Sequence, residues 1–69
     1  MEFITTDYRF DHGAEPRGRG SWAFSPRRHP AADDKTIFWS PAEATFAEAK
    51  KAARAHFKGT GIAFLWVLA

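Results

Sequence analysis

The C-terminal segment 62–68 is apolar at every position, and this constrains the fold more than any other feature of the chain. As a strand, it presents Ile62, Phe64, Trp66 and Leu68 on one face and Ala63, Leu65 and Val67 on the other. A strand that is apolar on both faces is typical of the interior of a covered sheet. One helix covers only one face, so the other carries an exposed patch or is covered by loops or a partner. Leu65 and Val67 are therefore candidate self-association residues, and a homodimer is one expected assembly.

A helix is predicted over residues 41–58. Ser40 can cap its first N–H groups, Pro41 suits the first helical position, and Glu43 would complete a capping box. Alanine, the best helix former, recurs along the segment, and Gly59 supplies a stop. The residues of the expected buried stripe are Ala42, Phe46, Ala49, Ala53 and Phe57.

Short apolar or alternating stretches predict three further strands, at residues 2–10, 21–25 and 36–39. The fold class is then α+β, in the order β-β-β-α-β, with one mixed four-stranded sheet and a single helix packed on one face. We expect one small domain, residues 1–69. The C-terminal strand should lie beside the first strand and run in the same direction as the third. Basic loops are expected at 13–20 and 26–35.

Size leaves few ways to stabilise this fold. The chain has 69 residues and no cysteine, so disulfides and thiolate zinc sites are excluded. A domain of this length buries only about 60% of its unfolded surface, so the core must depend on packed aromatic side chains. The N-terminus lacks the pattern of a signal peptide, and the apolar C-terminal run is too short to cross a bilayer. We expect a cytoplasmic protein with no membrane partner.

Segment 16–29 holds four arginines and none of the eight acidic residues. The arginines Arg17, Arg19, Arg27 and Arg28 are candidate partner-binding residues, because the guanidinium group suits both phosphate and carboxylate. Trp22 could stack on a base or belong to the core, and the core is the stronger interpretation. A loop whose arginines are merely solvated is the plain alternative. The net charge of +2 is low for a nucleic-acid-binding protein.

The predicted helix adds three candidate cations, Lys51, Arg54 and Lys58, which also complement the helix dipole. His12, His29 and His56 lack the spacing of metal ligands on one element, so no metal is expected. Ser21, Ser25 and Ser40 have no nucleophile elbow, and no phosphate-binding or dinucleotide motif is present. We therefore expect neither an enzyme nor a cofactor.

Three stretches together resemble small proteins encoded by phages and other mobile elements of Gram-negative bacteria, a group that includes anti-CRISPR proteins. The stretches are Arg17-Gly18-Arg19-Gly20-Ser21-Trp22-Ala23-Phe24, Phe38-Trp39 and Phe46-Ala47-Glu48-Ala49-Lys50. The resemblance implies a non-catalytic inhibitor in the host bacterial cytoplasm that blocks a host protein or ribonucleoprotein complex. It assigns no site residues. The alternative is a nucleic-acid-binding accessory or regulatory domain that uses the Arg-Gly loop.

Overall fold

The structure is a computed structural model that describes residues 1–68. The strands and helices among these residues follow one another in this order: β1 (Glu2–Ile4), α1 (Thr6–His12), β2 (Arg19–Gly20), β3 (Ala23–Ser25), β4 (Phe38–Trp39), β5 (Ala44–Thr45), α2 (Phe46–His56) and β6 (Phe64–Val67). The predicted α+β class is confirmed, but the single-helix prediction is wrong because two helices are present. The predicted strands at 21–25, 36–39 and 62–68 exist in shorter form.

The four-stranded sheet has the order β1-β6-β3-β4. The apolar strand β6 is thus interior and lies beside β1, as its two-sided apolar pattern predicts. It pairs parallel to β1 and antiparallel to β3, and β4 pairs antiparallel to β3. β4 and β6 therefore run in the same direction, also as predicted. A second, two-stranded sheet joins β2 to β5.

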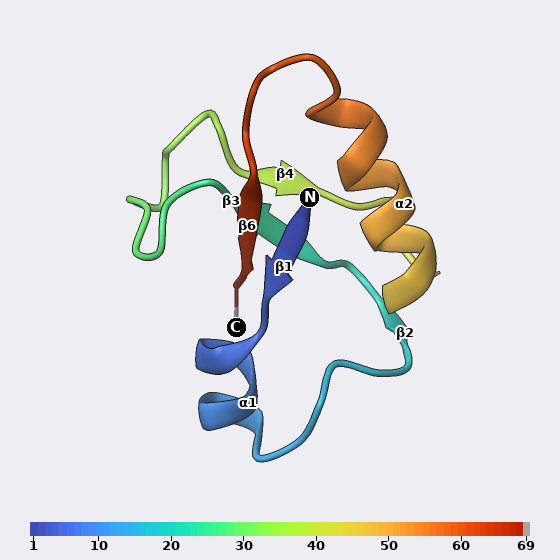
Figure 1. The fold of residues 1–69 in the computed structure, drawn as a ribbon. Helices are drawn as coiled ribbons and strands as arrows, with labels where there is room; N and C mark the ends of the chain where they lie inside the picture. The colour runs from blue at the N-terminus through green and yellow to red at the C-terminus, as the bar shows by residue number, and fades with distance from the viewer. Residues whose placement is uncertain (69) are drawn as a thin grey trace.

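Helix α2 covers one side of the large sheet, while α1 and the connection between β3 and β4 lie away from it (Figure 1). The core forms between α2 and the sheet, where Ala49 and Ala53 of α2 join Leu65 and Val67 of β6 in one buried cluster. The prediction of an exposed patch around Leu65 and Val67 is wrong, because both side chains are fully buried in this core. The uncovered face of β6 is the opposite one, which carries Phe64.

The N-terminal segment 2–10 is not one strand. Only Glu2–Ile4 are extended, and α1 follows immediately. The alternation of residue types in this segment fits a strand, but helical spacing brings Tyr8 and His12 into a stacked contact with ring centroids 4.0 Å apart. Gly13 ends the helix in the left-handed region at φ 67, and its N–H donates to the Arg9 carbonyl.

Helix α2 begins five residues later than predicted, at Phe46, and ends at His56. The sequence holds two candidate capping boxes, and the second one is used: the Thr45 hydroxyl accepts from the Glu48 N–H, and the Glu48 carboxylate accepts from the Thr45 N–H. Ser40 is instead buried, and its Oγ accepts a hydrogen bond from the Trp22 N–H at 2.8 Å. The hydrogen bond between Ser40 and Trp22, and the pairing of β5 with β2, thus prevent the helix from starting earlier.

Thr45→Ala should destabilise the fold by about 1 kcal/mol, because it removes the acceptor for the Glu48 N–H at the start of α2. Thr5→Ala is the matched control, since Thr5 occupies the N-cap position of α1 without a side-chain capping hydrogen bond. Urea unfolding followed by circular dichroism measures both changes. Equal losses in the two variants would contradict the assignment of the capping box.

Candidate functional site

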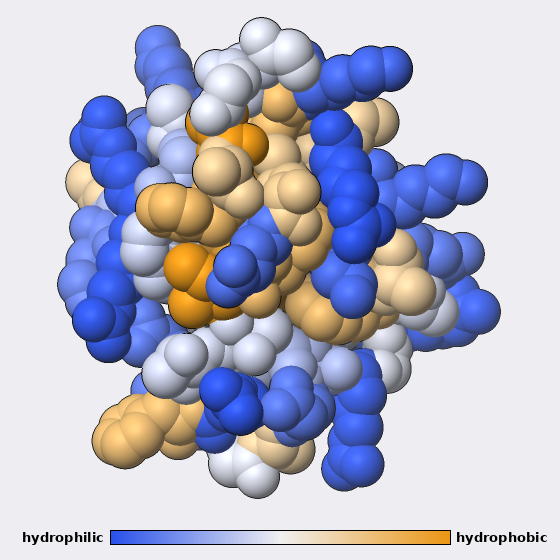
Figure 2. Space-filling view, viewed as in Figure 1, coloured by the Kyte–Doolittle hydropathy of each residue, from blue (hydrophilic) through white to orange (hydrophobic). Residues whose placement is uncertain are grey.

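Large aromatic side chains are exposed on the parts of the molecule that α2 does not cover. Phe10 of α1 is 88% exposed, Trp39 of β4 is 64% exposed, and Phe64 of β6 is 44% exposed. Figure 2 shows apolar surface over the middle of the molecule, where β1 and β6 lie in Figure 1, with hydrophilic side chains around it. Exposed aromatic groups of this size in a small chain indicate an interaction surface.

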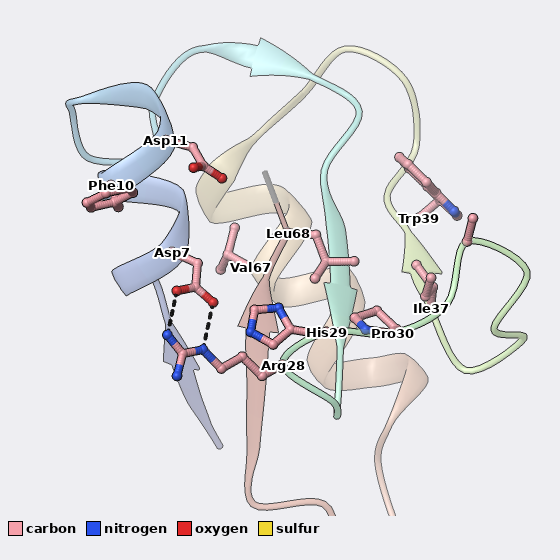
Figure 3. A pocket seen from close by; sticks show the side chains of 11 residues that line it. Asp7, Phe10, Asp11, Arg28, His29, Pro30, Ile37, Trp39, Val67 and Leu68 are labelled. Atoms are coloured by element: carbon pink, nitrogen blue, oxygen red, sulfur yellow. Dashed lines mark hydrogen bonds and ion pairs between the residues drawn. The ribbon is translucent and has the colours of Figure 1, made fainter.

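A groove of about 530 Å³ lies between α1 and β4. Its floor is the end of the C-terminal strand, with Val67 and Leu68 (Figure 3). Phe10 stands at the α1 side, and Trp39 stands at the opposite side beside Ile37. We call this feature the aromatic groove; its lining residues are Asp7, Phe10, Asp11, Arg28, His29, Pro30, Ala32, Ile37, Trp39, Val67 and Leu68.

An ion pair joins the two walls of the aromatic groove. The Arg28 Nε and Nη2 atoms donate to the two carboxylate oxygens of Asp7, each at 3.0 Å (Figure 3). This two-point contact connects the β3–β4 loop to α1. The hydrogen bond from Arg28, with the positive charges of Arg28 and His29, holds the pKa of Asp7 below its usual value of 3.8. The contact therefore fixes the position of the loop relative to the helix.

The remainder of the β3–β4 loop is also held by polar contacts. The Asp34 Oδ1 atom accepts from both the N–H and the hydroxyl of Thr36, and the Arg27 guanidinium lies 3.8 Å from Asp34 Oδ2. These hydrogen bonds from Thr36, followed by the charge of Arg27, lower the pKa of Asp34. The Arg27 N–H donates to the buried Ser25 hydroxyl. Hydrogen bonds and an ion pair thus link the residues of the β3–β4 loop, which forms this wall of the groove.

Asp7→Asn should make the stability of the chain less sensitive to acid. Because the folded-state pKa of Asp7 is depressed, its ionised form stabilises the fold above the ordinary value, and this contribution is lost as the pH falls through the folded-state pKa. Asparagine does not titrate. We expect the urea midpoint of the wild-type chain to fall further than that of the variant between about pH 6 and about pH 3.

Asp11→Asn is the control for this comparison, since Asp11 lies on the same helix and makes no ion pair with residues 1–68. It should lose stability in acid as the wild type does. An Asp7→Asn chain with the same acid sensitivity as the wild type would contradict the stabilising role of the ion pair.

A second cavity, of about 350 Å³, adjoins the aromatic groove and shares Trp39 and Leu68 with it. We call it the arginine cavity, because Arg17 and Arg19 line it. Tyr8 and His12 of α1 and the residue Trp22 also line it. Trp39 therefore lies between two hollows that differ in their charged lining residues.

The structure divides the four arginines predicted to bind a partner. Arg17 and Arg19 line the arginine cavity, Arg28 lines the aromatic groove, and Arg27 lines neither. Three of them have acidic partners from outside the segment: Arg19 with Glu48, Arg27 with Asp34 and Arg28 with Asp7. Among residues 1–68, Arg17 has no ion pair. The acid-free segment is therefore not one free basic patch.

Trp22 belongs to the core. It is 7% exposed, its indole N–H donates to the Ala44 carbonyl at 2.9 Å, and its ring packs on Phe46. This burial favours the structural interpretation of Trp22 over a stacking platform. Trp22 also lines the arginine cavity, but at 7% exposure it offers little surface to a ligand.

Of the three cations predicted on the helix, Lys51 and Arg54 lie on α2, and Lys58 follows the end of that helix at His56. Lys51, Arg54 and Lys58 are exposed, and none of them lines the aromatic groove or the arginine cavity. The Arg54 guanidinium lies 5.1 Å from the centre of the Phe3 ring, a cation–π contact that supports packing. These residues remain predicted partner-binding residues, but the structure does not bring them together with the loop arginines.

Phe10 and Trp39 are not among the site residues predicted from the sequence. The strand predicted over residues 2–10 is extended only at Glu2–Ile4, and Phe10 lies in α1. Trp39 carried a usable signal, because Phe38 and Trp39 are adjacent in one strand and only one of them can face the core. Phe38 packs against the core, which turns Trp39 to the groove.

Residues 1–68 contain no group of three or more histidine, aspartate or glutamate side chains placed to hold a metal ion. Neither helix in this part of the chain is long and apolar enough to span a membrane. Comparison of the chain with protein families, curated proteins and solved structures finds no match. The interpretation of the site therefore rests on its own geometry.

Proposed function

We propose that this chain is a small non-catalytic binding protein that docks on a partner protein through the aromatic groove. The observation that carries this proposal is the pair of exposed aromatic side chains, Phe10 and Trp39, on opposite sides of an apolar floor. Aromatic residues at the centre of an interface contribute most of the binding energy when a partner excludes water from them. The Asp7–Arg28 contact joins the two walls of this groove.

Charge favours a protein over a nucleic acid as the partner. Asp11 lines the aromatic groove and makes no ion pair with residues 1–68, so its carboxylate would repel a phosphate backbone, while the charge of Asp7 is matched by Arg28. Arg27 and Arg28 already face acidic side chains of the chain itself, which lowers the positive charge available to phosphates. A net charge of +2 adds little long-range attraction for nucleic acid.

The biological role that we propose is inhibition by occlusion, with a host defence complex as the partner. This part of the proposal draws on the resemblance to phage-encoded proteins of the anti-CRISPR type. A chain that covers a functional surface of such a complex needs no catalytic group, only a stable interface of ordinary size.

The test is affinity capture of host proteins with the tagged chain, followed by reconstitution of the complex from purified components. Phe10→Gln removes the most exposed aromatic side chain and keeps a good helix former in α1. Phe64→Thr is the matched control, since Phe64 is exposed and lies outside the aromatic groove. We expect Phe10→Gln to lose the partner and Phe64→Thr to retain it.

Equal retention by both variants would contradict the assignment of the groove as the contact surface. The nucleic-acid alternative is tested in the same series with single-stranded DNA and RNA. Direct binding that weakens steeply with added salt, through counterion release, would favour the alternative over a protein partner.

A further inference from the structure

The arginine cavity differs from the aromatic groove in charge. Its lining residues include Arg17 and Arg19 and no carboxylate, whereas two carboxylates, Asp7 and Asp11, and one arginine, Arg28, line the groove next to it. The uncharged part of its wall is largely aromatic, with Tyr8 and the neighbouring Trp39. Such a cavity suits an anionic group that is carried on a short apolar stem.

Both arginines can exchange their present contacts for a ligand. Arg17 is exposed and makes no ion pair with residues 1–68. Arg19 lies 3.6 Å from the Glu48 carboxylate, and both side chains are more than half exposed, so water screens this pair. The Arg19 Nη1 atom also donates to the Glu43 carbonyl at 3.1 Å, and neither Glu43 nor Glu48 lines the arginine cavity, so a ligand there would draw this guanidinium away from both contacts.

The two hollows are continuous across one residue. Trp39 and Leu68 line both of them, so a bound chain that crosses Trp39 would enter the groove on one side and the cavity on the other. An extended peptide places successive side chains about 3.3 Å apart along its axis, so neighbouring residues of one segment can reach neighbouring subsites.

We propose that the segment of the partner recognised here is an acidic and apolar linear peptide. Its large apolar side chain fills the aromatic groove, and a carboxylate two or more residues away pairs with Arg17 and Arg19. This inference rests on the proposed function and specifies the chemistry of the partner. A nucleic-acid strand fits less well, because its regularly spaced phosphates would also meet Asp11 in the groove, whose carboxylate makes no ion pair with residues 1–68.

The experiment is selection from a displayed library of random peptides, with the intact chain as bait. We expect the enriched sequences to carry Asp or Glu near Leu, Phe or Trp. A synthetic peptide of the enriched sequence is then titrated by fluorescence anisotropy. Arg17→Ala/Arg19→Ala should weaken its binding by at least about tenfold, because each lost hydrogen bond involves a charged group.

Lys51→Ala/Lys58→Ala is the charge-matched control and should bind the peptide as the wild type does, since both lysines lie outside the two cavities. Enrichment of neutral or basic peptides, or of none, would overturn the inference. The inference would also be overturned if oligothymidylate bound in a way that depends on Arg17 and Arg19 and the selection enriched no acidic peptide. A partner that needs Phe10 but not the two arginines would remove this inference and leave the proposed function intact.

Discussion

Phe24→Ala is expected to leave the chain largely unfolded at room temperature. Phe24 is fully buried in β3, and its ring contacts the rings of Phe3, Phe38 and Phe46. Truncation of a buried phenylalanine to alanine costs about 3–5 kcal/mol. A chain of this length has a total stability of only about 3–10 kcal/mol, so the loss removes much or all of it.

Circular dichroism and urea unfolding measure this effect. Phe64→Ala is the control, because the same atoms are removed from a side chain that is 44% exposed, and its cost should be clearly smaller. A Phe24→Ala chain that unfolds at the same urea concentration as Phe64→Ala would contradict the position of Phe24 at the centre of the core.

Trp39→Thr is expected to weaken binding of the captured partner by about 30-fold to 1,000-fold, which corresponds to about 2–4 kcal/mol. Trp39 lines both hollows, so its removal affects both ends of the proposed peptide site. Threonine suits a strand, and the exposed indole contributes little to the core, so the fold should be retained.

Isothermal titration of the purified complex measures the loss of affinity, and circular dichroism verifies the fold. Phe64→Thr makes the same kind of change on β6 and should alter affinity by less than about threefold. Equal losses of affinity in Trp39→Thr and Phe64→Thr would contradict a defined binding site at Trp39, because exposed aromatic side chains would then contribute alike wherever they lie.

The strongest sequence patterns predicted the central part of the fold. The two-sided apolar run predicted an interior β6 beside β1, and this is confirmed. The sequence of this run does not show which of its two faces packs against α2, because the residues on both faces are apolar. Ala49 and Ala53 of α2 share one buried cluster with Leu65 and Val67, so these side chains of β6 belong to the core.

The helix starts were harder to predict, because local signals competed. Two sequence stretches fit a capping box, beginning at Ser40 and at Thr45, and local propensity favours neither. The hydrogen bond between Ser40 and the Trp22 N–H is a tertiary contact between residues 18 positions apart, which no local pattern reports. Glu43 also adopts a left-handed backbone conformation at φ 63, which interrupts a helix at that point.

The candidate site was only partly predictable for the same reason. Charge in the sequence identified the arginines, but their partners Asp7, Asp34 and Glu48 come from distant parts of the chain. Long-range pairing of this kind depends on the folded structure. Arg17 and Arg19 remain predicted partner-binding residues, and they line a cavity beside an aromatic groove that only the fold assembles.

Amide hydrogen exchange of the chain, free and bound to its captured partner, tests the central claim most directly. Contact through the aromatic groove predicts slower exchange on binding in residues 7–11 and 28–39, which form its two walls. Residues 46–58, which carry the helix cations, should exchange as in the free chain. Protection confined to residues 46–58 would contradict the account, because the partner would then cover α2 and leave Phe10 and Trp39 exposed.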